Sequence, residues 1–117
     1  MPLFLKEGVF MTFEVNGNVW KIVYCNPSNR NLMRSNNTYT LGVCDNSQKT
    51  IFLSNRLSGK MLDKVICHEL THVYSFENDY VMDIQTEEIV ADFMSLFGRD
   101  IIYLADEIMG NLLRRIA

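Results

Sequence analysis

The sequence predicts an α+β domain with a small antiparallel sheet, because strand signals fill its first half and helical spacing fills its second half. The chain has 117 residues, which is the length of one globular domain. Its 48% hydrophobic and 21% charged residues suit an ordered chain with a core, and no Pro-, Gly- or Ser-rich linker divides it. We therefore expect residues 1–117 to form a single domain.

The first strand signal is a β-hairpin over residues 12–24. Apolar residues alternate with polar ones in residues 12–15 and 18–24, as in a half-buried strand. Asn16 and Gly17 lie between the two segments, and this pair readily takes the positive φ angles of a type I′ turn. Residues 1–11 are expected to form a short lead-in.

A second hairpin is expected to join residues 39–43 to residues 50–53 through the polar segment 45–48. Tyr39 begins a second alternation of apolar with polar or small residues. Between the hairpins, residues 26–37 are rich in Asn, Ser and Arg and predict a long polar loop. The composition of this loop indicates no function.

The second half begins with a helix expected over about residues 59–75, where apolar residues recur at three- and four-residue steps. Ser58 is the expected N-cap, since its hydroxyl can accept a hydrogen bond from a free N–H of the first turn. The apolar positions of this helix are Leu62, Val65, Ile66, Leu70 and Val73.

A second helix is expected over about residues 86–97, with Gly98 as its C-terminal stop. One or two shorter helices are expected to follow, the first at residues 100–109 and the second, if it forms, at residues 111–116, with Gly110 between them. The apolar face of the second helix would contain Ile89, Val90, Phe93, Met94 and Phe97.

The chemical signal lies in the first of these helices, where residues 68–72 read H-E-x-x-H. Positions four residues apart differ by only about 40° around a helix, so His68 and His72 share one face and can hold one ion. Glu69 lies about 100° from His68, so it flanks the metal and can accept a proton from a water molecule that the metal activates. This arrangement predicts a Zn²⁺ site with Glu69 as general base.

The second helix offers the third ligand. Glu88 and Asp92 are four residues apart and share a face, sixteen residues and more beyond His72. Glu88 would complete a His–His–Glu set and leave a fourth position open, as in catalytic zinc sites. Asp92 would then accept an N–H from a ligating imidazole, and that of His68 is the expected one. Glu87 stays open as the alternative ligand, and both glutamates also suit a helix N-terminus.

The distribution of charge excludes one class of partner. Residues 1–67 hold eight Lys and Arg against four Asp and Glu, a net charge of +4, whereas residues 68–117 hold three against ten, a net charge of −7. Direct nucleic-acid binding is not expected, because it needs a clustered basic surface. Carboxylates, in contrast, are groups that metal ions bind.

The location of the protein is expected to be cytoplasmic. Cys25, Cys44 and Cys67 form no C-x-x-C pair and suit a reducing compartment, where each would be a small buried apolar residue. Residues 1–10 lack the pattern of a signal peptide, and no apolar run approaches the roughly 20 residues of a membrane span.

The His68 to His72 motif, together with Glu88, Ala91, Asp92 and Phe93, resembles the gluzincin type of zincin metallopeptidase, and most of all the short ImmA/IrrE-like metallo-endopeptidases of phages and mobile elements. Those proteins follow H-E-x-x-H with a helix patterned E-x-x-A-[ND]-x-F. Here the phenylalanine falls one place early, at Phe93. The similarity covers mainly residues 50–98.

The resemblance implies a minimal zincin fold and zinc-dependent cleavage of a cytoplasmic protein, which in that family is often a helix-turn-helix repressor. It also implies that Glu88 is the third ligand, and that the strand at residues 50–53 resembles the edge strand along which a zincin's peptide substrate adds. An ordinary hairpin strand is the equal alternative for residues 50–53.

The residue that would stabilise an oxyanion is left open. Both histidines belong to the motif, so the additional histidine of many gluzincins is absent. The candidate donors are a backbone N–H and the side chains of Tyr74, Tyr80 and Tyr103, although each tyrosine is more easily explained by packing.

Two functions are therefore carried forward. The first is a zinc endopeptidase that hydrolyses a peptide bond in a protein substrate, and the second is a non-catalytic binding module that keeps a zincin scaffold and sequesters a protein partner. A protease acting on small peptides or on DNA-bound proteins is a weaker third option. The oligomeric state is not indicated by the sequence.

Overall fold

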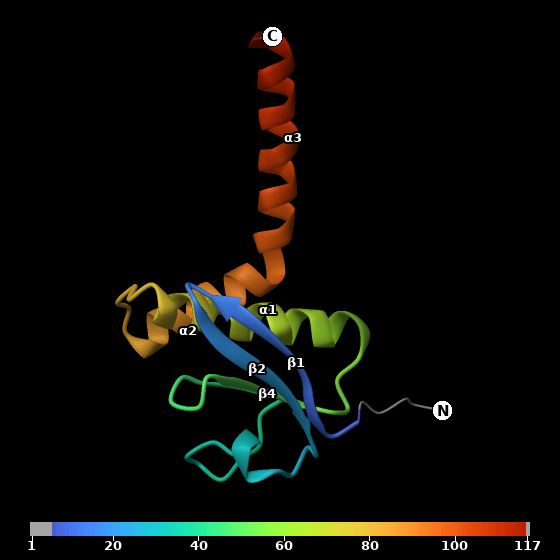
Figure 1. The fold of residues 1–117 in the computed structure, drawn as a ribbon, viewed down its shortest axis with the longest axis vertical. Coiled ribbons are helices and arrows are strands. Elements are labelled where there is room, and N and C mark those ends of the chain that lie inside the picture. Colours follow the sequence, from blue (N-terminus) through green and yellow to red (C-terminus); the bar gives the residue numbers. More distant parts are fainter. Residues whose placement is uncertain (1–5, 117) are drawn as a thin grey trace.

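The computed structural model describes residues 6–116. Its first hairpin joins β1 (Gly8–Val15) to β2 (Asn18–Cys25) in antiparallel pairing (Figure 1). Asn16 and Gly17 both take positive φ, at 52° and 83°, so the predicted turn geometry is confirmed. β1 begins at Gly8, within the expected lead-in, whereas residues 1–5 of that lead-in lie outside the described residues.

The second hairpin also forms, from β3 (Gly42–Asp45) and β4 (Thr50–Ser54). The strand order is β1-β2-β4-β3, and β2 pairs with β4 in parallel. The sheet is therefore mixed, and the prediction of a purely antiparallel sheet was wrong. The cause is the segment between β2 and β3, which carries the chain to the far edge of the sheet, so that β4 returns between β3 and β2.

That strand order also shows that the expectation of an edge strand at residues 50–53 was wrong. β4 is buried along its whole length and pairs on both sides, so its backbone cannot receive another strand. β3 is the edge strand of this hairpin, and its outer backbone groups are the ones open to a further strand.

The segment predicted as a polar loop contains a short 3₁₀ helix, η1 (Arg30–Leu32). Leu32 is fully buried and forms a small core with Cys25 and Phe52 on one face of the sheet. A single leucine among polar residues therefore anchors the loop. Because η1 covers this face, β4 is buried on both sides.

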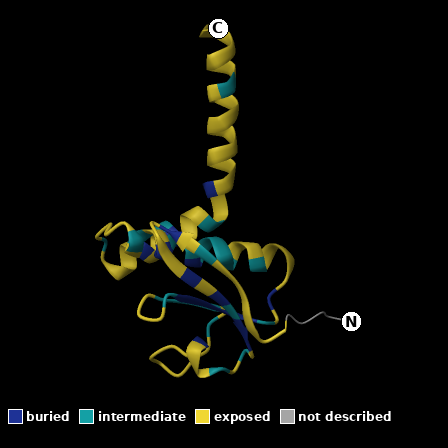
Figure 2. Cartoon of the chain, viewed as in Figure 1, coloured by how far each residue is buried: buried dark blue, intermediate teal, exposed yellow. Residues whose placement is uncertain are grey.

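The other face of the sheet carries the main core and the helix α1 (Gly59–Glu77), which begins as predicted and extends two residues further. Ser58 lies at the N-cap position, but its side chain makes no capping hydrogen bond, which differs from the expectation. The buried residues of this core are Val15, Trp20, Ile22, Tyr24, Ile51, Leu53, Leu57 and Val73, with the remaining predicted apolar positions of α1 packed against them (Figure 2).

The end of α1 is tied to the sheet by Glu77. Its carboxylate accepts hydrogen bonds from Trp20 Nε1 at 2.9 Å and from Lys49 Nζ at 2.7 Å, and also from the side chain of Asn18. The hydrogen bond from Lys49 is the largest of the effects that lower the pKa of Glu77 below its ordinary value.

We expect Glu77→Gln to lower stability at pH 7, with a difference from the parent that shrinks in acid. A carboxyl group whose pKa is lowered by folding stabilises the fold above its unfolded pKa, near 4.5, and this contribution disappears as the pH falls through the lower folded value. Urea unfolding of parent and variant from pH 7 to pH 3 measures the difference. The exposed Glu14→Gln is the control and should show no such pH dependence. A constant difference at every pH would contradict the role of the charge.

The helical half differs from the predicted boundaries. α2 (Ile84–Phe93) starts two residues early, because Asp83 caps it by accepting the N–H of Thr86 at 2.7 Å. A π-helical turn, η2 (Met94–Gly98), then leads directly into α3 (Arg99–Ile116). The expected stop at Gly98 and the expected break at Gly110 were both wrong. Gly98 is buried within the helical run, where an added Cβ would lie 2.6 Å from Met94 Cε.

The apolar face predicted for the second helix is mostly not a core face. Ile89 is 69% exposed and Phe93 is 51% exposed, while the buried side chains of α2 are Glu87 and Ala91. The side of α2 that meets α1 carries the carboxylates of Glu87, Glu88 and Asp92, and of these only Glu87 is buried. Among residues 6–116, no helix is long and apolar enough to cross a membrane.

Candidate metal centre

Two helices bring three side chains to one point. His68 and His72 lie one turn apart on α1, and their Nε2 atoms are 3.3 Å apart. Glu88, in the first turns of α2, places Oε1 2.7 Å from His72 Nε2 and Oε2 3.3 Å from His68 Nε2. One ligand atom from each residue lies within 4.8 Å of the others, so these three residues could hold a metal ion.

The other nitrogen of each imidazole faces a second carboxylate. His68 Nδ1 lies 2.9 Å from Asp92 Oδ1, which is the pairing expected for Asp92. His72 Nδ1 lies 3.6 Å from Glu87 Oε1, and this oxygen is buried without a hydrogen-bond partner. Glu87, the alternative ligand, thus faces away from the three converging atoms and toward the back of His72.

This arrangement favours one tautomer of each ring. A carboxylate at Nδ1 favours the tautomer with its proton on Nδ1, which leaves the Nε2 lone pair free. The lone pairs of His68 and His72 then point at each other and at the carboxylate of Glu88. Three acceptors at such distances repel one another unless a cation or a proton lies between them. The donor set therefore fits a metal ion.

The spacing also fits a tetrahedral ion. Ligands at about 2.0–2.1 Å from a tetrahedral zinc are separated from one another by about 3.3 Å. The two Nε2 atoms and the pair from His68 to Glu88 have this separation, at 3.3 Å each. The 2.7 Å between His72 and Glu88 is shorter, and a small rotation of the half-exposed Glu88 side chain opens it.

Glu69 lies beside this group on α1 and is 6% exposed. Burial is the main cause that raises the pKa of Glu69 to about 7, with His68 and Arg34 acting against it and Glu88 acting with it. A bound cation would lower that pKa again.

The approach of α1 to β3 requires Gly42, because a Cβ there would lie 2.7 Å from Val65 Cγ1 and 3.3 Å from Glu69 Cγ.

The metal group opens into a groove of about 760 Å³ between β3, α1 and α2. Residues 40–44 form the wall that belongs to the sheet, and His68, Glu69 and His72 form the floor. Cys44 also lines the groove, but burial raises the pKa of its thiol far above the usual range, so it is no ready thiolate ligand.

The three candidate tyrosines are not brought to this groove. Tyr74 and Tyr103 line a different cavity, on the side of α1 that faces α3, and Tyr80 is 68% exposed after the end of α1. The groove is lined instead by Arg34 and Tyr39, from the segment that precedes β3. Sequence reasoning missed both, because a polar loop carries no periodic signal that would locate its side chains.

The fold and the site together define a small α+β domain with a candidate His–His–Glu metal centre at the foot of an open groove. Comparison with family models, curated proteins and solved structures finds no significant match to this chain. The chemistry of the site must therefore be argued from its own residues.

Proposed function

We propose that the protein is a zinc-dependent endopeptidase acting on a cytoplasmic protein. The observation that carries this proposal is the convergence of His68, His72 and Glu88, with a carboxylate behind each imidazole. Two nitrogens and one carboxylate oxygen, with a groove beside them, are the donor set of a catalytic zinc site with an open fourth position. The resemblance of the H-E-x-x-H segment to zincins agrees with this proposal but does not carry it.

Glu69 is the proposed general base. It neighbours His68 on α1, lines the same groove and is not one of the three converging ligands. When bound, zinc supplies Lewis-acid polarisation of the scissile carbonyl and makes the attacking water more acidic. Glu69 accepts the proton of that water and then donates it to the leaving amine. Its burial keeps bulk water from competing for the carboxylate.

The proposed substrate is an extended polypeptide that adds to β3 as a further strand. β3 is an edge strand, and its residues 42–44 line the same groove as the metal group. An extended chain on this edge would form backbone hydrogen bonds independent of its sequence and would cross the site with its own carbonyl groups exposed. Arg34 and Tyr39 are the groove residues proposed to donate to the oxyanion.

The test is metal-dependent cleavage of a peptide library by the purified chain, read by mass spectrometry. We expect cuts within extended peptides after loading with Zn²⁺, loss of cutting after chelation, and recovery when Zn²⁺ is returned. Free zinc at the same concentration and the chelated protein are the controls. Zinc-loaded, folded protein that cuts no member of the library nor an unfolded protein would contradict the proposal.

A non-catalytic binding module is the second candidate, and one observation favours it. None of the three tyrosines expected as oxyanion donors reaches the groove. If Arg34 and Tyr39 do not donate to the oxyanion in their place, the groove would capture an extended segment and hold its partner uncut. The same library distinguishes the two functions, because a binder retains intact peptides on the immobilised zinc-loaded protein, whereas a peptidase releases fragments.

A further inference from the structure

The last helix stands away from the rest of the domain. α3 runs from Arg99 to Ile116, projects beyond both the sheet and α1 (Figure 1), and contains no buried residue (Figure 2). The radius of gyration is 16.6 Å, whereas a compact chain of this length has about 13 Å. The protein is 55 Å long along its longest axis, and this elongation is due to α3.

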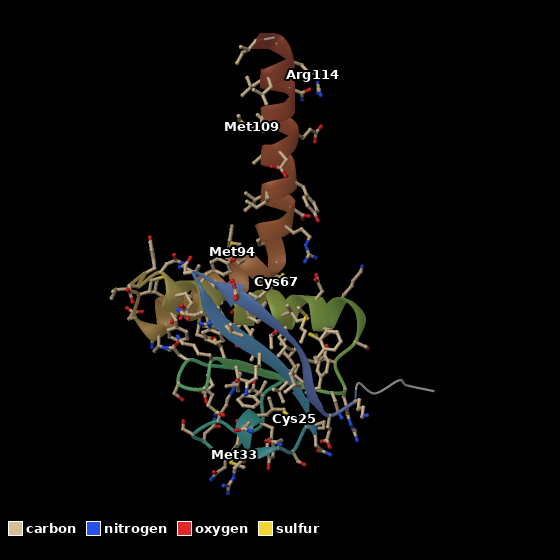
Figure 3. All side chains as sticks on the ribbon, in the orientation of Figure 1. Cys25, Met33, Cys67, Met94, Met109 and Arg114 are labelled. Atoms are coloured by element: carbon tan, nitrogen blue, oxygen red, sulfur yellow. The ribbon has the colours of Figure 1, made fainter. Side chains whose placement is uncertain are left out.

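The exposed surface of α3 is divided into two faces. Met109 and Arg114 point to opposite sides of the helix (Figure 3). The polar face includes Asp106, Glu107 and Arg114, and the side with Met109 is apolar. We call this side the apolar face of α3. Its large side chains are between 46% and 80% exposed, and Ala105 lies among them. The large side chains are those of Ile101, Ile102, Leu104, Ile108, Met109, Leu112, Leu113 and Ile116.

Such a helix is not expected to persist alone in water. Isolated helices of this length are marginal, and most helical stability in proteins comes from packing of an apolar face. Eight large apolar side chains on one face also exceed the scattered exposed residues of an ordinary monomer surface. The apolar face of α3 therefore requires a partner.

The charges of α3 indicate what that partner is. Asp100, Asp106 and Glu107 lie in its first ten residues, whereas Arg114 and Arg115 lie in its last turn. Helical spacing places Asp100 and Arg115 along one edge of the apolar face, whereas Asp106, Glu107 and Arg114 point away from it. Two copies paired antiparallel about Ile108 place Arg115 of each helix beside Asp100 of the other, twice over by symmetry. A parallel pair would place like charges together. With Arg99, α3 has three basic and three acidic residues, and such a helix does not suit an anionic membrane surface, which attracts basic helices.

A cavity at the base of α3 fits the end of the second helix. This cavity, about 440 Å³, lies between α1 and α3 and is lined largely by apolar groups of Leu70, Met94 and Ile102. In an antiparallel pair centred on Ile108, the partner's Leu113 and the partner's Ile116 lie level with residues 100–103. These side chains would fill the cavity and would extend the contact from α3 onto the body of the domain.

We propose that the apolar face of α3 binds a second copy of this chain, forming an antiparallel symmetric dimer in which each α3 lies against the base of the other. The groove and the metal group lie on the opposite side of α1, so each copy keeps its own site open. The dimer does not depend on the proposed peptidase function.

The test is the mass of the intact chain in solution, measured by light scattering and sedimentation. We expect twice the monomer mass of 13.6 kDa, and dissociation on dilution accompanied by a loss of helical circular dichroism. Ile108→Glu should give a monomer. Gly110→Glu is the matched control, since it adds the same charge two residues away on the polar face, where a side chain has room, and it should remain a dimer. The fluorescence of Trp20, which is fully buried in the core, shows whether the domain is folded in both variants and does not depend on the metal site.

The orientation is tested by disulfide trapping. A mixture of Ile101→Cys and Arg115→Cys chains should form mixed disulfides in the antiparallel dimer, whereas a parallel dimer would give only like pairs. A parent chain that is monomeric at every concentration, or an Ile108→Glu variant that stays dimeric, would overturn the proposal. Binding of a monomeric parent to anionic phosphatidylserine vesicles would overturn it in favour of a membrane surface.

Discussion

Glu69→Gln is expected to lower the rate of peptide cleavage by a factor of about 10²–10⁴ while zinc binding is retained. Glutamine keeps the shape of the buried side chain but cannot accept and return a proton. Glu69 is outside the converging group of His68, His72 and Glu88, so the ligand set is unchanged. The measurements are the cleavage rate under saturating Zn²⁺ and the zinc content of the purified variant.

The control for this substitution is Glu107→Gln, which makes the same change on the exposed α3. It should cleave at the parental rate. A Glu69→Gln variant that cuts as fast as the parent would remove Glu69 as the base, even if the metal centre is correct. Loss of zinc together with loss of cleavage would instead assign Glu69 a role in holding the metal.

His72→Ala is expected to abolish tight zinc binding and, with it, the stabilisation that zinc gives the fold. His72 supplies one of the three converging ligand atoms. It is only 6% exposed, so no ligand from a surface side chain can readily take its position at the metal. A ligand present at 100 times its dissociation constant stabilises the native state by about 2.7 kcal/mol. Thermal unfolding with and without Zn²⁺ should show this gain in the parent and no gain in His72→Ala. His68→Ala, at a less buried position, tests the same loss with less disturbance of packing.

Substitutions of Glu87 and Glu88 are expected to weaken zinc binding to different extents. Glu87→Gln is expected to weaken zinc binding by about 10–100-fold without abolishing it, because Glu87 orients His72 and is no ligand. Glu88→Gln should cost more, since it removes a ligand. Zinc titration by competition with a chelating dye measures both. The reverse order of the two losses would mean that Glu87 is the ligand and that Glu88 is not.

Local sequence signals were sufficient to predict those turns and helices whose conformation depends on residues near one another in the chain. The Asn16-Gly17 pair set its turn, and the apolar spacing of residues 62–73 set the helix that carries the metal group. Gly98 and Gly110 misled, because a glycine stops a helix only where the chain takes a left-handed turn, and neither has a positive φ here. The parallel pairing of β2 with β4 could not be predicted, because neither strand carries a local sequence signal for it.

The candidate site was predictable for the residues that share a helix and not for those that packing brings near. His68, Glu69 and His72 are fixed by helical spacing, and Glu88 and Asp92 by the same spacing on α2. The groove wall is different, since it is β3 and the segment before it, and β4 had been expected there. Arg34 and Tyr39 reach the groove because Leu32 anchors their loop.

The sequence by itself therefore determined the α+β class and which side chains share one face of α1 or one face of α2, because both follow from a fixed rise and twist along single elements. The meeting of those two faces at one point is a result of packing. Only the tertiary structure decided which strand lies at the edge, which carboxylate faces which nitrogen of His72, and that α3 leaves its apolar face uncovered. Those outcomes depend on how elements pack against one another. Packing is decided by the shape and burial of surfaces distant in the chain, and no local periodicity records it.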